Sequence, residues 1–98
     1  MSLYIVRCNF NDPDREEEWN RWYSTDHSAK LLALPGFQSV TRYRAVGLDK
    51  AIKYMAVWSI DRPDLLQSEP YKAVGGGSWP ESWRSSISDW SRTIYEEI

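Results

Sequence analysis

The sequence predicts one α+β domain whose elements follow the order strand, helix, strand, strand, helix, strand. Three features lead to this prediction: an alternating apolar stretch opens the chain, an amphipathic stretch stops at a proline–glycine pair, and two β-rich stretches then follow one another around a turn. A chain of 98 residues suits one domain. We therefore expect residues 1–98 to fold as a single unit.

The first strand is expected over residues 3–10, which alternate before a turn-forming Asn-Asp-Pro-Asp. A helix should follow, capped by Asp12 or Asp14 and favoured by three glutamates in its first turns. The Ser-Thr-Asp at residues 24–26 can cap a second segment, so we expect this helix to break or kink just before His27. The proline–glycine pair then ends it.

The second half of the chain should hold a hairpin, an irregular helical region and a last strand. Residues 37–46 and 51–60 are rich in β-branched and aromatic side chains and flank a turn. The helical region is interrupted by Pro70 and ended by glycines 75–77. A last strand is expected over residues 90–98. Before it, a short aromatic helix is indicated by the helical spacing of Trp79, Trp83, Ile87 and Trp90.

This order of elements is that of a ferredoxin-like βαββαβ sandwich, a four-stranded antiparallel sheet with its helices on one face. The third strand carries large apolar groups on both faces, with Tyr54 and Trp58 on one and Met55 and Val57 on the other. Helices can cover only one of these faces. We expect a second copy of the sheet to cover the other.

The composition argues against nucleic acid and membrane partners. The net charge is −2, the twelve basic residues are scattered, and the third strand lacks the glycine–aromatic pattern of RNA-binding sheets. No stretch approaches the roughly 18 apolar residues that span a bilayer. Cys8 is the only cysteine, which favours a cytoplasmic protein without intrachain disulfides. One histidine argues against a protein-held metal site, but haem needs only one axial ligand.

Several short motifs resemble the dimeric α/β-barrel superfamily, in particular its small EthD-like members. They are a Trp-Tyr pair with a histidine four residues after the tyrosine, Leu-Pro-Gly-Phe at 34–37 and Arg-Tyr-Arg at 42–44. The resemblance covers residues 3–60 and 89–98, whereas 61–88 match only in layout. It implies a homodimer whose two sheets form a barrel, with a pocket in each subunit between helices and sheet. Members of the superfamily include muconolactone-type isomerases, cofactor-free monooxygenases and haem-degrading proteins.

His27 is the leading catalytic candidate, because a neutral imidazole beside an apolar pocket can take or give a proton near pH 7. The alternative is a structural histidine that hydrogen-bonds a backbone carbonyl. Tyr23, one helical turn earlier, could donate to a substrate oxygen or be a core tyrosine. Asp26 cannot orient His27 by adjacency, since neighbouring helix residues point about 100° apart.

Other residues are candidates for holding a substrate. Arg42 and Arg44 share a strand face and could hold a carboxylate or an enolate; they could also be a solvated edge or pair with acids at a dimer interface. Aromatic side chains could stack a planar ligand, although most should be core. These are Trp19, Trp22, Trp58, Tyr71, Trp79 and Trp83.

Together these residues predict a small cofactor-free enzyme that acts on a hydrophobic cyclic or aromatic oxygenated metabolite. The expected chemistry is an isomerase or lyase reaction in which His27 moves a proton and Tyr23 supports a developing oxyanion. A cofactor-free monooxygenase of the same superfamily is the first alternative. A non-catalytic protein that binds a small molecule or haem is the second.

Overall fold

The computed structural model describes residues 1–49, 52–75 and 78–98. The predicted start of the third strand at residue 51 and two glycines of the 75–77 run lie outside these ranges. The elements are β1 (Ser2–Phe10), α1 (Glu16–Trp22), the π-helical turn η1 (Tyr23–His27), α2 (Ser28–Leu32), β2 (Phe37–Arg44), β3 (Tyr54–Ile60), the 3₁₀ helix η2 (Pro63–Gln67), α3 (Glu69–Val74), α4 (Glu81–Arg84) and β4 (Ile87–Glu96).

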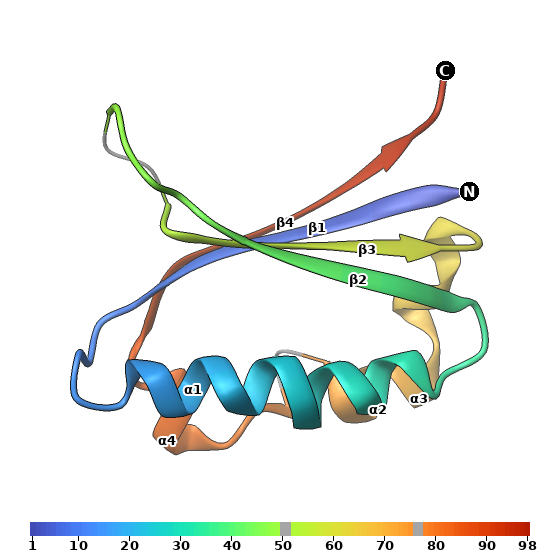
Figure 1. Ribbon diagram of the computed structural model, residues 1–98. Coiled ribbons are helices and arrows are strands. Elements are labelled where there is room, and N and C mark those ends of the chain that lie inside the picture. Colours follow the sequence, from blue (N-terminus) through green and yellow to red (C-terminus); the bar gives the residue numbers. More distant parts are fainter. Residues whose placement is uncertain (50–51, 76–77) are drawn as a thin grey trace.

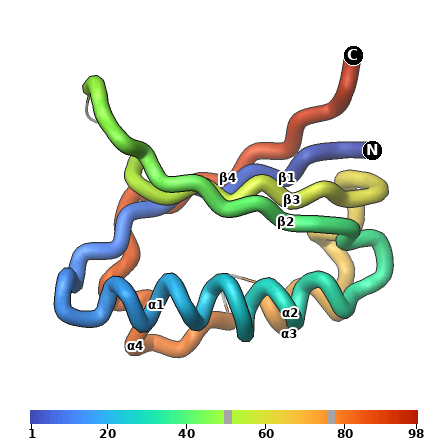
Figure 2. The backbone as a smooth tube through the Cα atoms, viewed as in Figure 1, coloured from blue at the N-terminus to red at the C-terminus, as the bar shows by residue number. Residues whose placement is uncertain are grey.

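The four strands form one sheet in the order β2-β3-β1-β4, and every neighbouring pair is antiparallel. All helical segments lie on one side of this sheet (Figure 1). The tube view shows the helix from α1 to α2 running along that side as one rod (Figure 2). The predicted ferredoxin-like α+β fold is therefore confirmed.

The first helix does not break before His27. Instead the chain widens into the π-turn η1, which continues directly into α2. The Ser28 hydroxyl donates to the carbonyl of Tyr23 at 2.8 Å, and the Thr25 hydroxyl donates to the carbonyl of Arg21 at 2.7 Å. These side chains therefore bond back to the helix they belong to rather than capping a new segment, and the predicted break is wrong.

The predicted cap of the first helix is also wrong. Arg15 occupies the N-cap position and makes no side-chain capping bond. The Asp12 carboxylate accepts a hydrogen bond from the amide of Asp14 at 3.1 Å, which closes a turn before the helix begins. Neither aspartate is therefore left to cap α1.

Two predictions in the second helical region need correction. Pro70 does not interrupt a helix but lies at the start of α3, where the missing amide proton costs no hydrogen bond; Ser68 caps this helix. The aromatic helix is only the four residues of α4, and β4 already begins at Ile87, opposite Phe10. The helix therefore does not extend to Ile87 and Trp90, because these residues belong to β4, which pairs with the edge of β1.

The core lies between the sheet and the helices and is largely aromatic. Trp19 is fully buried and Trp58 is 1% exposed. Alternate residues of β1 and β3 face this layer and are buried, as the period of two requires. The residues between them, such as Ile5 and Val57, face the opposite side and are only half-buried. The outer face of the sheet therefore remains apolar and uncovered in the single chain.

Candidate functional site

The only histidine lines a crevice on the helical side of the molecule. The crevice has a volume of about 110 Å³ and lies between η1–α2, α3 and the segment before α4. This is slightly below the roughly 150 Å³ of an apolar cavity known to hold benzene. Its lining residues are Trp22, His27, Lys30, Ala73, Val74, Ser78, Trp79 and Pro80.

Four aromatic rings surround the imidazole of His27. The Trp22 ring stacks on it with centroids 5.4 Å apart and an angle of 18° between planes. Tyr23, Trp79 and Trp58 meet it edge to face at 4.8, 5.1 and 6.1 Å. The ring is 4% exposed. Trp58 belongs to the sheet, so His27 bridges the core and the crevice.

This environment keeps His27 neutral. Burial, together with the positive charges of Lys30 and Arg42, lowers the pKa of the imidazole to about 4. Among the described residues we find no hydrogen bond to either ring nitrogen. At pH 7 the neutral ring therefore has one nitrogen that can accept a proton and one that can donate a hydrogen bond.

A second polar group in the crevice wall also lacks a partner. Trp79 is 4% exposed, and its indole Nε1–H is buried without donating a hydrogen bond to any described residue. A buried donor left without a partner costs about 1–3 kcal/mol. An oxygen atom of a ligand beside Trp79 and His27 would recover part of that cost.

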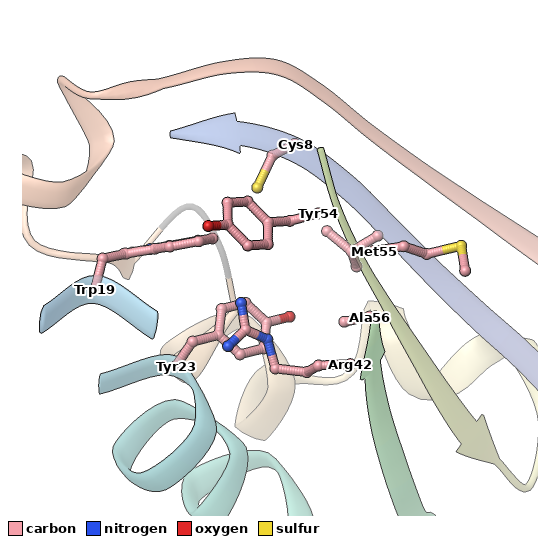
Figure 3. A pocket seen from close by; sticks show the side chains of 8 residues that line it. Cys8, Trp19, Tyr23, Arg42, Tyr54, Met55 and Ala56 are labelled. Carbon is pink, nitrogen blue, oxygen red and sulfur yellow. The ribbon is translucent and has the colours of Figure 1, made fainter. Parts of the chain in front are cut away.

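Tyr23 and Arg42 line a different, smaller cavity on the sheet side of the same helix (Figure 3). Its volume is about 10 Å³, which is room for about one water molecule. Figure 3 shows the Arg42 guanidinium lying over the Tyr23 ring, with the thiol of Cys8 and the ring of Trp19 also turned to this space. The indole Nε1 of Trp19 is a second buried donor without a partner.

Arg42 is a half-buried cation held by aromatic faces and neutral oxygens. Its guanidinium carbon lies 4.3 Å from the Tyr23 ring centre and 5.2 Å from that of Trp19. It donates to the carbonyl and side-chain oxygens of Asn20 at 3.2 and 2.9 Å, and to the Ser24 hydroxyl at 3.0 Å. No carboxylate among the described residues forms an ion pair with it. Arg42 thus points inward, rather than lying at the solvated edge that the sequence left open.

Tyr23 and Cys8 stay protonated in this cavity. Burial raises the pKa of the Tyr23 hydroxyl well above its usual value, and burial raises the pKa of the Cys8 thiol to about 11. Tyr23 therefore remains a donor at neutral pH. Its ring touches His27, but the residues lining the crevice do not include it.

The remaining predicted site residues are spread over the fold. Arg44 is exposed and lines a surface hollow with Glu16 and Lys53, which does not include Arg42. Tyr71 is buried and hydrogen-bonded to Tyr4. Trp83 packs against Phe10 and lies under the guanidinium of Arg15. The structure thus brings Trp22 and Trp79 together with His27, and Trp19 together with Tyr23 and Arg42.

Sequence reasoning missed Lys30, Ala73, Val74 and Ser78 as lining residues and Cys8 as a cavity residue. Lys30 lies three residues after His27, one helical turn further on, so helical spacing could have indicated it. Residues of α3 and of the segment before α4 are brought to the crevice by tertiary packing. No local pattern reports that placement.

Comparisons with known proteins agree with this fold. No model of a known protein family matches the sequence, and no curated protein matches it either. Among solved structures, an ethyl tert-butyl ether D (EthD) family protein from Bacillus halodurans C-125 is similar at 17% identity and a TM-score of 0.63, over the full length of both chains. HapK from Hahella chejuensis is similar at 13% identity and a TM-score of 0.70, over all of this chain and 93% of HapK.

This chain shares the ferredoxin-like fold of these two proteins. The resemblance drawn from the sequence is thereby confirmed for the fold. At these identities the likeness does not extend to an activity. Within the described ranges, no group of three or more histidine, cysteine or acidic side chains is placed to hold a metal ion. None of the helices described here is long and apolar enough to cross a membrane.

Proposed function

We propose that this chain is a cofactor-free cytoplasmic enzyme that moves a proton on a hydrophobic cyclic or aromatic oxygenated metabolite, in an isomerase or lyase reaction. The observation that carries the proposal is a neutral imidazole, caged by aromatic rings, at the wall of a crevice of about 110 Å³. The aromatic part of this wall can bind a small flat ring, and the imidazole lies at its edge.

The proposed step is a proton transfer between carbon atoms. His27 takes a proton from a carbon next to a carbonyl group, and the electron pair of that C–H bond moves into an enolate. The imidazolium then returns the proton to another carbon of the same molecule, so the product is an isomer. The enolate in turn stabilises the charged ring against the burial that favours its neutral form.

The developing oxygen charge needs donors close to the crevice. Trp79 offers an indole N–H without a partner, and Lys30 brings a positive charge to the same wall. Tyr23 lines the other cavity and not this crevice, so its place in the proposal is to position the His27 ring. Its effect on His27 comes through the edge-to-face contact at 4.8 Å.

Deuterium exchange tests the proton transfer without knowledge of the natural substrate. The probe is 2-cyclohexenone, a monocyclic ketone with acidic C–H bonds, in D₂O; the loss of its α-proton signal is followed by ¹H NMR. We expect the wild-type chain to accelerate exchange and the His27→Gln variant to be slower by about 10²-fold or more. The matched control is Asp26→Asn, whose exposed neighbouring carboxylate should not matter.

Undiminished exchange by His27→Gln, or an equal loss in Asp26→Asn, would refute the assignment of His27. Binding of 2-cyclohexenone without accelerated exchange would refute the enzyme and favour a non-catalytic binding protein. Uptake of O₂ with the ketone would favour the monooxygenase reaction. A Soret band on haem addition that His27→Gln abolishes would refute a cofactor-free site.

We further propose that the chain forms a homodimer through the outer face of its sheet. On this face Ile5 pairs with Val57, and Tyr43 and Tyr95 are 52% and 48% exposed. A second sheet would remove this apolar surface from water. Light scattering during size-exclusion chromatography should give twice the monomer mass of 11.5 kDa for the wild type.

The Val57→Glu variant should be monomeric, since each copy would bury an unpaired carboxylate in the interface. The matched control is Leu32→Glu, an exposed apolar position (39%) on α2, on the other side of the sheet. This control should leave the dimer intact. A wild type that elutes as a monomer at micromolar concentration would refute the dimer.

A further inference from the structure

A second hollow lies at the other end of the helical layer, between β1, η2 and β4. Its volume is about 360 Å³, within the range of about 300–1,000 Å³ that small-molecule sites occupy. No residue that lines it also lines the His27 crevice. The lining residues are Tyr4, Pro63, Leu66, Gln67, Arg92 and Ile94.

The hollow exists because the helices leave part of β4 uncovered. Arg92 lies opposite Val6 and Ile94 opposite Tyr4, so both face the helical side. Yet Ile94 is 38% exposed, whereas Tyr4 on the neighbouring strand is 2% exposed. This side is opposite the outer sheet face, so a sheet-to-sheet dimer leaves the hollow open.

The floor of the hollow carries a buried pair of tyrosine hydroxyls. The hydroxyls of Tyr4 and Tyr71 are hydrogen-bonded at 2.8 Å, and Tyr71 is 4% exposed. One hydroxyl donates in this bond, and the other keeps a proton that it can donate elsewhere. When the Tyr71 hydroxyl donates to the Tyr4 oxygen, the Tyr4 hydroxyl keeps its own proton. Because Tyr4 lines the hollow, it can donate this proton to a ligand there. Burial raises the pKa of Tyr4, so this proton is retained at neutral pH.

Arg92 adds a positive charge beside this pair. It lies on β4, next to β1, and lines the same hollow as Tyr4. No carboxylate among the residues described here forms an ion pair with Arg92. The surrounding walls of Pro63, Leu66 and Ile94 are apolar. A donor, an unpaired guanidinium and apolar walls therefore converge on one space.

We propose that this hollow binds the carboxylate of an apolar, ring-bearing acid. The Arg92 fork would take the two carboxylate oxygens, the Tyr4 hydroxyl would donate to one of them, and the apolar body would lie against Pro63, Leu66 and Ile94. The site goes beyond the proposed function and does not rest on His27. Helix α3 separates the two, because it gives Tyr71 to the tyrosine pair and Ala73 and Val74 to the crevice.

Isothermal titration with 2-naphthoate and its neutral isostere 2-naphthamide tests the site on the full chain. We expect the wild type to bind 2-naphthoate at least 10-fold more tightly than 2-naphthamide, since the charged hydrogen bonds are worth about 1.5–3 kcal/mol. Arg92→Gln should remove this preference, and Tyr4→Phe should reduce it. The matched controls are Arg21→Gln, an exposed arginine on α1, and His27→Gln; both should bind like the wild type.

Several results would overturn the proposal. The first three are no measurable binding of 2-naphthoate, equal affinity for 2-naphthoate and 2-naphthamide, and wild-type affinity for 2-naphthoate in Arg92→Gln. The fourth is an equal loss of affinity in Arg21→Gln, which would mean non-specific charge attraction. A loss confined to His27→Gln would place the acid in the crevice and also overturn it. Circular dichroism of each variant confirms that the compared chains are folded.

Discussion

Replacing His27 by phenylalanine should remove much of the dependence of folding stability on pH between pH 7 and pH 5. Phenylalanine keeps a ring within the aromatic cage but cannot titrate. Burial lowers the pKa of His27 from 6.5 to about 4, so the native state resists the proton that the unfolded chain accepts. Because this is the only histidine, the variant isolates its contribution.

The sign and size follow from linkage. Between the two pKa values the unfolded state binds more protons, so the free energy of unfolding rises with pH and falls on acidification. The whole difference is worth about 3 kcal/mol, of which about 2 kcal/mol is lost between pH 7 and pH 5. Below about pH 4 His27 is protonated in both the folded and the unfolded state, so further acidification causes no more loss of stability through this residue. The pKa of Glu16 is lowered by Lys53 and Tyr54, so its stabilisation is lost only at more acidic pH.

Urea unfolding at pH 7, 6 and 5 measures the effect. Each series uses one protein concentration, because dimerisation makes stability depend on it. The quantity compared is the change in free energy of unfolding across pH in each chain, not the absolute stability. We expect a loss of about 2 kcal/mol for the wild type and a nearly flat profile for His27→Phe.

Parallel profiles for the two chains would refute the reasoning. They would mean that His27 keeps an ordinary pKa in the folded protein and is therefore neither caged nor desolvated. A profile that rises on acidification would mean that the folded state holds the charged ring. That result would also remove the basis for a neutral imidazole in the proposed reaction.

Two further predictions concern the fold. Gly36→Ala should lower the free energy of unfolding in urea by about 1–3 kcal/mol, because Gly36 has φ +90° and a Cβ there would collide with Leu65. The control Gly47→Ala, which has open space around it, should change this free energy by no more than about 0.5 kcal/mol. Equal effects of the two substitutions would contradict the reasoning. Tyr71→Phe should cost about 1–3 kcal/mol by leaving the buried Tyr4 hydroxyl without its partner, and the exposed Tyr43→Phe should be neutral. Part of the Tyr71→Phe loss should return in a double variant with Tyr4→Phe; no recovery would contradict the pairing.

The order of the elements could be predicted from the sequence because strand alternation and the Leu-Pro-Gly-Phe stop are local signals. Where local signals compete with tertiary pairing, prediction failed. Ile87 and Trp90 continue a helical spacing, yet β1 presents a free ladder edge at Phe10 that takes Ile87 into the sheet. Pro70 reads as a helix breaker, but the same ring constraint also suits a helix start.

The candidate site could be predicted only in part. His27 and its neighbours Trp19, Tyr23 and Trp22 lie on one helix, so their proximity follows from spacing. The crevice itself needs α3 and the segment before α4, which come to His27 through packing more than 40 residues along the chain. Which cavity each side chain faces depends on its direction around the helix axis to within a fraction of a turn. The periodicity of the sequence does not resolve such small differences.

The π-turn explains why Tyr23 and His27 are neighbours that face two cavities. Buried residues follow at intervals of four from Trp19 to Leu31, and in an α-helix each such step drifts by about 40°. Over three steps an α-helix would carry Leu31 away from the sheet, and the wider turn at η1 absorbs part of that drift. A kink before His27 would restore the same phase, so the spacing alone could not distinguish the two. Because the turn keeps the helix continuous, His27 stays packed against Trp58 of the sheet, which lowers its pKa by burial, while its edge lies at the crevice. The geometry that buries the imidazole thus also presents it to a ligand.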